Sequence, residues 1–198
     1  MIAGLLLASG ASRRFGSNKL VAPLHGRAVV RWSAEGLARA VDATFVVVPP
    51  ESDEIRAALR GLPVRWVENF DAREGMASSI RAGVAAVPTD AEAVVITLGD
   101  QPLIDAAVIR DVVARWRAAP PGTRAVVAEY DDGRGHPALF GAPLFADLRA
   151  LDGDRGARDL LASLGESVAV VRAPGVRPVD VDTPDVLAEL ERACRRSG

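Results

Sequence analysis

A loop of small and basic residues follows the first apolar stretch of the chain. It reads Leu7-Ala8-Ser9-Gly10-Ala11-Ser12-Arg13-Arg14-Phe15-Gly16-Ser17-Asn18-Lys19. Small residues let backbone N–H groups approach an anion closely, and three basic side chains add positive charge. The loop therefore predicts a nucleotide-phosphate site, with an ordinary strand-to-helix turn as the alternative. It is neither a P-loop nor a dinucleotide fingerprint, because the glycine spacing fits neither motif.

The basic residues of the chain are unevenly distributed in type and in position. Of the 24 basic side chains, 23 are arginines and one, Lys19, is a lysine. The first 34 residues contain no Asp or Glu and carry a net charge of +5, whereas the remainder carries −7. This asymmetry predicts an anionic ligand near the N-terminal segment, although arginine-rich codon usage is an alternative cause. The total charge of −2 argues against non-specific nucleic-acid binding.

The composition excludes several other classes of protein. With 198 residues, 49% of them hydrophobic, the chain is expected to form one domain with a sizeable core. The lone Cys194 excludes an internal disulfide framework, and two histidines give little support for a catalytic triad or a zinc site. No apolar run has the length of a membrane helix, and no basic region precedes the apolar Met1–Ala8. We therefore expect a cytoplasmic protein without membrane association.

Short apolar runs alternate with amphipathic helical patterns along the chain. The predicted strands are Ile2–Ala8, Thr44–Val48, Val64–Val67, Ala93–Leu98, Ala125–Ala128 and Val168–Val171. The predicted helices are Val29–Ala40, Asp53–Leu59, Ala77–Val87, Ile104–Ala118, Ala157–Leu164 and Pro184–Arg195, the last with Thr183 as its N-cap. This order indicates a single α/β domain, a Rossmann-like three-layer sandwich with a mostly parallel sheet. In such sheets ligands bind beyond the carboxyl ends of the strands.

The small-residue loop resembles a signature of pyrophosphorylase-type nucleotidyltransferases, Leu-x-Ala-Gly-x-Ser-x-Arg-Met/Phe-Gly-x-x-Lys, and most of all that of the MobA/MocA-like molybdenum-cofactor group. Ser9 departs from the family's Ala or Gly at a position near the base, which leaves the base open. Five further segments resemble family elements in the same order. They are Asn69…Gly75-Met76-Ala77-Ser78-Ser79, Gly99-Asp100-Gln101-Pro102, Gly135-His136-Pro137-Ala138-Leu139-Phe140, Gly153-Asp154-Arg155-Gly156-Ala157-Arg158 and Asp180-Val181-Asp182-Thr183-Pro184.

The resemblance implies a fold of the nucleotide-diphospho-sugar transferase type and a magnesium-dependent reaction. A nucleoside monophosphate would pass from a nucleoside triphosphate to the phosphate of molybdopterin cofactor, with release of pyrophosphate. The last three segments look like the cytidylyl branch, so CTP is favoured, and a molybdoenzyme would receive the product. The alternatives are a GTP-using guanylyltransferase, a nucleotidyltransferase for a sugar phosphate or another small phosphorylated acceptor, and a non-catalytic cofactor carrier.

Two aspartates are the predicted magnesium ligands. Magnesium takes hard oxygen ligands, commonly one or two carboxylates plus phosphates and water. Asp100 lies just past the apolar run Val94–Leu98, so its carboxylate is expected at the edge of the sheet. Asp182 is the second ligand, although Asp-x-Asp-Thr-Pro is also a natural helix start. Asp180 would share the face of Asp182 if the preceding strand ran on that far.

Within the resemblance, Lys19 is expected to reach the α-phosphate, and Arg14 the β- and γ-phosphates. A compact ammonium follows a moving phosphoryl group better than a planar guanidinium does. Leu7, Ala8, Ser9 and Gly10 complete the predicted nucleotide site.

Four further residues have two interpretations each. Ser78 and Ser79 open a helix, where they would bind a phosphate or simply cap the helix. Asn69 would hydrogen-bond the ribose or the base. His136, in a turn-rich hairpin, would contact the acceptor or act as a base, and stabilising its own loop is the alternative.

Overall fold

The computed structural model describes residues 1–10, 15–153 and 156–195. Its strands are β1 (Ile2–Leu7), β2 (Pro23–Leu24), β3 (Arg27–Ala28), β4 (Ala43–Val48), β5 (Val64–Glu68), β6 (Ala93–Leu98), β7 (Ala125–Tyr130), β8 (Gly133–Gly141) and β9 (Val168–Arg172). Its α-helices are α1 (Val29–Ala38), α2 (Asp53–Ala58), α3 (Met76–Ala86), α4 (Ala106–Arg117), α5 (Phe145–Arg149), α6 (Arg158–Ser163) and α7 (Pro184–Arg195). All six predicted strands and all six predicted helices are present, with ends within two residues of the prediction.

Seven strands form one sheet in the order β5-β4-β1-β6-β8-β7-β9. Strand β8 runs antiparallel to both of its neighbours, and every other pair is parallel. Because β4 follows β1 on one side and β6 adjoins it on the other, the strand order reverses at β1. In open α/β sheets, ligands bind beyond the carboxyl ends of the strands at such a reversal. The fold therefore directs attention to the segments that follow β1 and β6.

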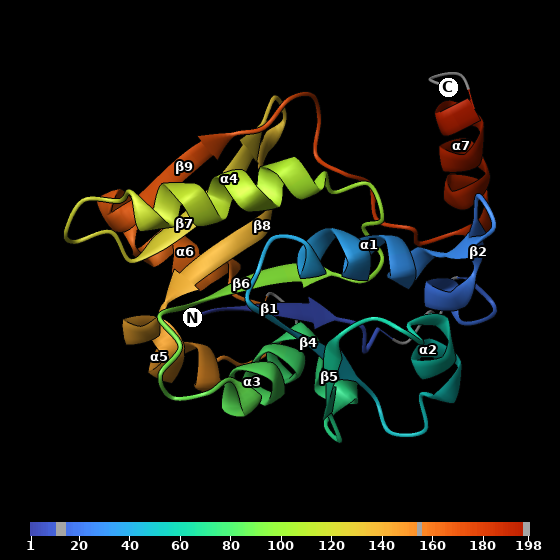
Figure 1. Cartoon of the computed structure of the whole chain (residues 1–198), viewed down its shortest axis with the longest axis horizontal. Coiled ribbons are helices and arrows are strands. Elements are labelled where there is room, and N and C mark those ends of the chain that lie inside the picture. Colours follow the sequence, from blue (N-terminus) through green and yellow to red (C-terminus); the bar gives the residue numbers. More distant parts are fainter. Residues whose placement is uncertain (11–14, 154–155, 196–198) are drawn as a thin grey trace.

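Helices cover both faces of the sheet, which makes three layers (Figure 1). Helices α1 and α4 pack on one face through residues such as Leu37 and Val112, and α3 and α5 pack on the other through Ile80 and Leu148. All six residues of β1 are buried, as a strand covered on both faces requires. The predicted three-layer, mostly parallel α/β architecture is confirmed.

Strand β8 lies in the sheet although its sequence predicts turns. It contains three glycines and Pro137, which are poor strand formers, and only its position between β6 and β7 explains its conformation. The ladder with β7 shifts register there, from Val127 opposite Ala138 to Ala128 opposite Gly135. His136 and Pro137 therefore form a bulge, which removes the proline from the ladder and places the histidine at the carboxyl edge of the sheet.

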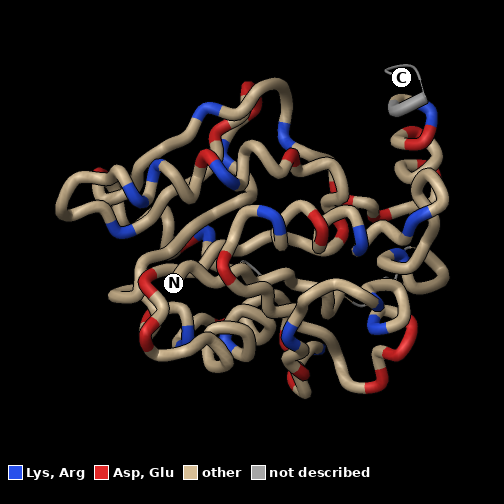
Figure 2. Tube along the Cα trace, in the orientation of Figure 1, with Lys and Arg blue, Asp and Glu red and all other residues tan. Residues whose placement is uncertain are grey.

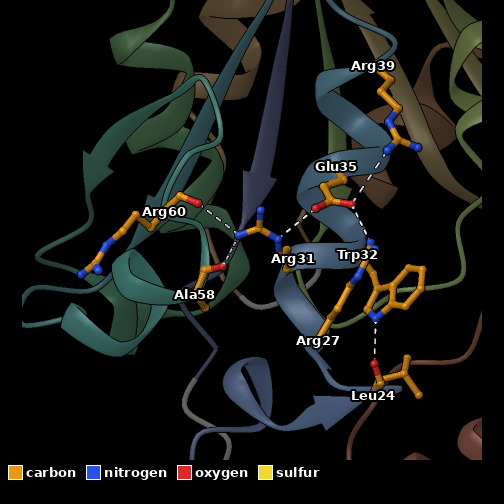
Figure 3. A network of polar contacts seen from close by, with 8 residues as sticks. All are labelled: Leu24, Arg27, Arg31, Trp32, Glu35, Arg39, Ala58 and Arg60. Atoms are coloured by element: carbon orange, nitrogen blue, oxygen red, sulfur yellow. Dashed lines mark hydrogen bonds and ion pairs between the residues drawn. The ribbon is translucent and has the colours of Figure 1, made fainter.

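A network around Glu35 fixes α1 to its neighbours (Figure 3). The Glu35 carboxylate pairs with Arg27 at 3.1 Å and with Arg31 at 2.9 Å. Arg31 also donates to the carbonyl oxygens of Ala58, the last residue of α2, and of Arg60, which follows the helix. Two of the five basic charges of the N-terminal segment thus stabilise the fold, so the predicted excess of +5 is not all available to an anionic ligand.

Residues 173–183, here called the strap, lead from β9 to α7 along the carboxyl edge of the sheet. Asp131 donates its backbone N–H to the carbonyl oxygen of Gly175. Arg177 donates its backbone N–H and its guanidinium Nε–H to the carboxylate of Asp132. Strand β9 ends at Arg172, so the condition under which Asp180 would share the face of Asp182 by strand alternation is not met. Helix α7 then lies beside β2 at one end of the molecule (Figure 1).

A small apolar cluster anchors α7. Val181 of the strap and Leu190 of α7 pack with Leu24 and Val29. The predicted cap is present, because Thr183 Oγ1 accepts the backbone N–H of Val186 at 3.3 Å.

Basic and acidic residues are interspersed over much of the trace from Glu35 onward, whereas no acidic residue precedes Glu35 (Figure 2). Within residues 1–10, 15–153 and 156–195, no helix is long and apolar enough to cross a membrane.

Candidate active site

Three of the predicted site residues meet at the carboxyl edge of the sheet. Lys19 follows β1, Asp100 follows β6 and Asp182 lies in the strap. The Nζ atom of Lys19 is 2.6 Å from Oδ2 of Asp100 and 2.8 Å from Oδ1 of Asp182. The lysine side chain is 9% exposed, whereas those of Asp100 and Asp182 are 21% and 34% exposed. An ammonium thus lies beneath two carboxylates that reach the solvent.

A tight turn after β6 positions Asp100. The N–H of Gly99 donates to the carbonyl oxygen of Leu7 at 2.9 Å, and the hydroxyl of Ser33 donates to the carbonyl of Gly99 at 3.2 Å. A Cβ atom at Gly99 would lie 3.1 Å from the oxygen of Leu7, so a larger residue would push the turn away from β1. The glycine thereby sets the spacing between the Asp100 turn and the loop that ends at Lys19.

The strap is attached to this turn by two hydrogen bonds. Val181 donates its backbone N–H to the carbonyl oxygen of Asp100 at 2.9 Å. Gln101 donates from Nε2 to Oδ1 of Asp180 at 2.7 Å. Since Val181 is completely buried, it fixes the strap and leaves Asp182 directed at Lys19.

Gln101 and Val181 were not among the predicted site residues. Both lie inside the segments Gly99–Pro102 and Asp180–Pro184 that carry the aspartates, and that adjacency was the available signal.

Lys19 begins a short 3-10 helix, Lys19–Val21, that is capped by Asn18. The Asn18 Oδ1 atom accepts the backbone N–H of Leu20 at 3.2 Å, and its Nδ2 donates to Glu54 at 3.3 Å. These bonds hold the backbone of Lys19 while its four-carbon side chain extends to the carboxylates. Arg14 lies outside the described residues.

Neighbouring charges and burial together shift the pKa values of Lys19 and Asp180. Burial lowers the pKa of Lys19, but the charges and hydrogen bonds of Asp100 and Asp182 together outweigh it, so the pKa is raised and the ammonium stays protonated. Burial raises the pKa of Asp180, and the charge of Asp100 raises it further against the hydrogen bond from Gln101. Asp180 therefore takes up a proton at a higher pH than an ordinary aspartate does.

The donor set suits a hard divalent cation that brings ligands of its own. No group of three or more His, Cys, Asp or Glu side chains arranged to hold a metal occurs among the residues the structure describes. Two carboxylates already converge on one cationic atom, the Lys19 Nζ. Magnesium commonly binds through one or two carboxylates, with phosphate and water oxygens completing its shell. The predicted pair of Asp100 and Asp182 fits that pattern, with phosphate oxygens required from a substrate.

His136 lies close enough to Asp100 for the two charges to interact. Burial lowers its pKa to about 4, against the attraction of Asp100, and the charge of Arg158 adds to the lowering. The imidazole is therefore neutral at pH 7 and a weak base, which favours a hydrogen-bonding role over general base catalysis. Its carbonyl oxygen accepts a hydrogen bond from the Tyr130 hydroxyl at 2.8 Å, which fixes the bulge.

Asn69, Ser78 and Ser79 form a buried network at the end of β5 and the start of α3. Asn69 donates from Nδ2 to the hydroxyls of Ser78 at 2.9 Å and Ser79 at 3.1 Å, and its Oδ1 accepts the N–H of Asp71. Ser78 in turn donates to the carbonyl of Gly75. Helix α3 begins at Met76, one residue earlier than predicted, and Gly75 is its N-cap residue. The interpretation of the serines as caps is therefore wrong, since both lie within the helix.

The first residues of the predicted nucleotide site follow β1 directly. Ala8 donates its N–H to the carbonyl of Val47 at 2.8 Å, and the hydroxyl of Ser9 donates to the same oxygen at 3.1 Å. Leu7, Ala8 and Ser9 are buried, whereas Gly10 is exposed. The Ser9 hydroxyl thus bonds to β4, and Gly10 is the first of these residues whose backbone faces the solvent.

Lys19, Asp100 and Asp182 thus lie beyond the carboxyl ends of the strands at the strand-order reversal, where open α/β sheets bind their ligands. A family model described as the MobA-like NTP transferase domain matches residues 4–170. The chain belongs to this family and is a nucleotidyltransferase, as the resemblance predicted.

Three relatives extend over almost the whole chain. The purine catabolism protein PucB of Bacillus subtilis is 32% identical over 201 residues, 96% of each chain. A molybdenum cofactor guanylyltransferase of Rhizobium leguminosarum bv. trifolii is 31% identical over 208 residues, 96% of this chain and 92% of the relative. The structure of Rv0371c of Mycobacterium tuberculosis in complex with manganese is 31% identical with a TM-score of 0.80, and it covers 96% of this chain and 97% of that one. The similarity confirms the fold of the nucleotide-diphospho-sugar transferase type.

Proposed function

We propose that this nucleotidyltransferase moves a cytidine monophosphate group from CTP to the phosphate of molybdopterin cofactor, with a divalent cation, and releases pyrophosphate. The observation that carries the proposal is the convergence of Lys19, Asp100 and Asp182 at the strand-order reversal. A lysine and two carboxylates are what nucleotidyl transfer needs from a protein, since its work is positioning and charge neutralisation. The product would pass to a molybdoenzyme.

In this reaction an oxygen of the acceptor phosphate bonds to the α-phosphorus while the bond to the bridging oxygen breaks. The electron pair of that bond leaves with pyrophosphate. The attacking phosphate is already anionic at pH 7, so no side chain has to remove a proton from it, consistent with the neutral state of His136. His136 would instead hydrogen-bond the acceptor at the edge of β8.

Asp100 and Asp182 would hold magnesium, which would neutralise charge on the triphosphate. The manganese complex of Rv0371c supports divalent-cation binding in a relative of the same fold. Lys19 would contact the α-phosphate, where charge shifts during the transfer. Arg14 is proposed for the β- and γ-phosphates on family resemblance.

The choice of nucleotide base, cytosine or guanine, separates the proposal from a second candidate function. The segments around His136 and Gly153 resemble the cytidylyl branch, which favours CTP. The guanylyltransferase of Rhizobium leguminosarum aligns with nearly the whole chain, which favours GTP. Ser9 leaves this choice open, because it is neither the Ala nor the Gly that the family has at this position.

Pyrophosphate release is the measurement that tests the proposal. Purified protein would be incubated with Mg²⁺, molybdopterin cofactor and either CTP, GTP or ATP, with Asp100→Asn as the control variant. Release with CTP in preference to GTP supports the proposal, and the reverse preference establishes the guanylyltransferase. Molybdopterin binding without release from any triphosphate would establish the non-catalytic carrier.

A further inference from the structure

The two carboxylate oxygens predicted to bind a divalent cation are the same two that hold Lys19. Nζ lies 2.6 Å from Asp100 Oδ2 and 2.8 Å from Asp182 Oδ1. Magnesium binds oxygen at about 2.1 Å, so a cation bound to both atoms would lie against the ammonium. Two like charges in contact repel strongly where solvent screening is weak. The ammonium and the metal therefore cannot both occupy this position.

We propose that Lys19 is a built-in counter-ion that competes with the divalent cation for Asp100 and Asp182, and that the triphosphate resolves the competition by providing Lys19 with a new anionic partner. This inference rests on the proposed function, because it assigns the metal and the triphosphate to this site. It adds an order to binding: metal alone binds weakly, and metal with nucleotide binds cooperatively.

In the proposed exchange, the divalent cation replaces the Lys19 ammonium at the two carboxylates. The burial of Lys19 explains why this exchange needs the triphosphate. Lys19 is 9% exposed, so an ammonium deprived of both carboxylates would lose two anionic partners at a position where water solvates it little. The carboxylates are more exposed and accessible to a metal from the solvent. The metal thus has to overcome the loss of the ion pairs unless a phosphate replaces them. A flexible lysine stem allows the ammonium to move between the two partners.

A neutral residue at position 19 should remove the competitor. We would titrate Mn²⁺ by calorimetry into wild type, Lys19→Met and Lys19→Gln without nucleotide, after checking each fold by circular dichroism. Both variants are expected to bind Mn²⁺ at least ~10-fold more tightly than wild type, the change that one lost like charge produces. They should also gain more thermal stability from Mn²⁺ than wild type does. Arg27→Met is the matched control, because Arg27 pairs with Glu35 away from the site, and it should bind like wild type.

The sole lysine of the chain allows a direct test in the wild-type protein. In a sample labelled with ¹⁵N-lysine, the side-chain ammonium spectrum holds one signal, that of Lys19. Addition of Mg²⁺ and CTP should shift this signal, and Asp100→Asn should shift it without any metal.

The outcomes separate the exchange from the proposed function. The exchange would be overturned if Lys19→Met or Lys19→Gln bound Mn²⁺ no more tightly than wild type does. It would also be overturned if the Lys19 signal did not move although calorimetry had verified that Mg²⁺ and CTP were bound. In those cases pyrophosphate release by wild type would leave the proposed function standing. Tighter Mn²⁺ binding without pyrophosphate release from any triphosphate would support the exchange and refute the nucleotidyl transfer proposed for this site.

Discussion

The backbone N–H of Val181 donates to the carbonyl oxygen of Asp100 at 2.9 Å, and this bond joins the two segments that carry the paired carboxylates. It leaves the side chains of Asp100 and Asp182 on either side of one ammonium. The geometry of the candidate site therefore depends on main-chain contacts as much as on the charged residues themselves, and the following predictions test both kinds of contribution.

Lys19→Arg should abolish most turnover while changing nucleotide binding little. A planar guanidinium keeps the charge but does not fit between two oxygens 2.6 and 2.8 Å from one nitrogen, nor follow a moving phosphoryl group. We expect kcat to fall by about 100-fold and KM for the nucleotide to stay within about threefold, the pattern of a lost transition-state contact. Steady-state pyrophosphate release gives both constants. Wild-type kcat in the variant would show that the ammonium has no special role.

Asp100→Asn should weaken both metal binding and the fold. The substitution leaves the buried ammonium of Lys19 with one carboxylate fewer, and it removes one predicted metal ligand. We expect a loss of about 1–3 kcal/mol in the free energy of unfolding. Urea denaturation with and without Mn²⁺ measures it, and Mn²⁺ should stabilise the variant less than wild type. Asp182→Asn, at the more exposed carboxylate, should destabilise the protein less.

Gln101→Ala should impair the site through Asp182 rather than by direct contact with a substrate. Loss of the hydrogen bond to Asp180 loosens the strap, so the second carboxylate is positioned less well. The concentration of Mg²⁺ needed for half-maximal activity should rise about tenfold, whereas kcat at saturating Mg²⁺ should recover to near the wild-type value. Asp132→Asn is the matched control, since it removes the carboxylate that pairs with Arg177, a residue of the strap that precedes Asp180. A Mg²⁺ requirement unchanged in Gln101→Ala would remove Gln101 as a positioning residue.

His136→Asn should reduce the loss of stability in acid. The folded protein binds a proton at His136 only near pH 4, whereas the ordinary pKa is 6.5. Between these values the unfolded chain takes up a proton that the folded chain does not, so stability from this group is complete above about pH 6.5 and falls toward pH 4.

Melting temperatures from pH 7 to pH 4 measure the effect of His136, and the curve of His136→Asn should be flatter than that of wild type. His25→Asn is the control. It replaces a histidine on an exposed turn with positive φ, a conformation that asparagine tolerates. Parallel curves for wild type and His136→Asn would contradict the burial argument.

The elements that the sequence predicted are those whose pattern is local. The continuous apolar runs of β1 and β6 and the cap of α7 are encoded by neighbouring residues, and each formed as expected. Strand β8 escaped prediction because its glycines and Pro137 signal turns. Its pairing with β7 is local, but its place in the sheet also depends on β6, which is distant in the sequence.

The candidate site likewise has features that the sequence predicted and features that it did not. Lys19, Asp100 and Asp182 were predictable because each lies just beyond a strand or before a helix. Their mutual contact was not, since it depends on the bond from Val181 of the strap to Asp100, which is distant in the sequence. Asn69, Ser78 and Ser79 show the opposite case, because a serine near a helix start has the same local signal whether it caps the helix or binds a buried asparagine. Arg27 and Arg31 contributed to the predicted charge excess, yet Glu35 neutralises them.

The strap has a consequence for biosynthesis. Lys19 and Asp182 are separated by 163 positions in the sequence, so the second carboxylate is synthesised long after the lysine. A ribosome releases the small-residue loop and the Asp100 turn long before it polymerises the strap. During that interval Asp182 is absent, so its ion pair with Lys19 can form only after the strap has been synthesised.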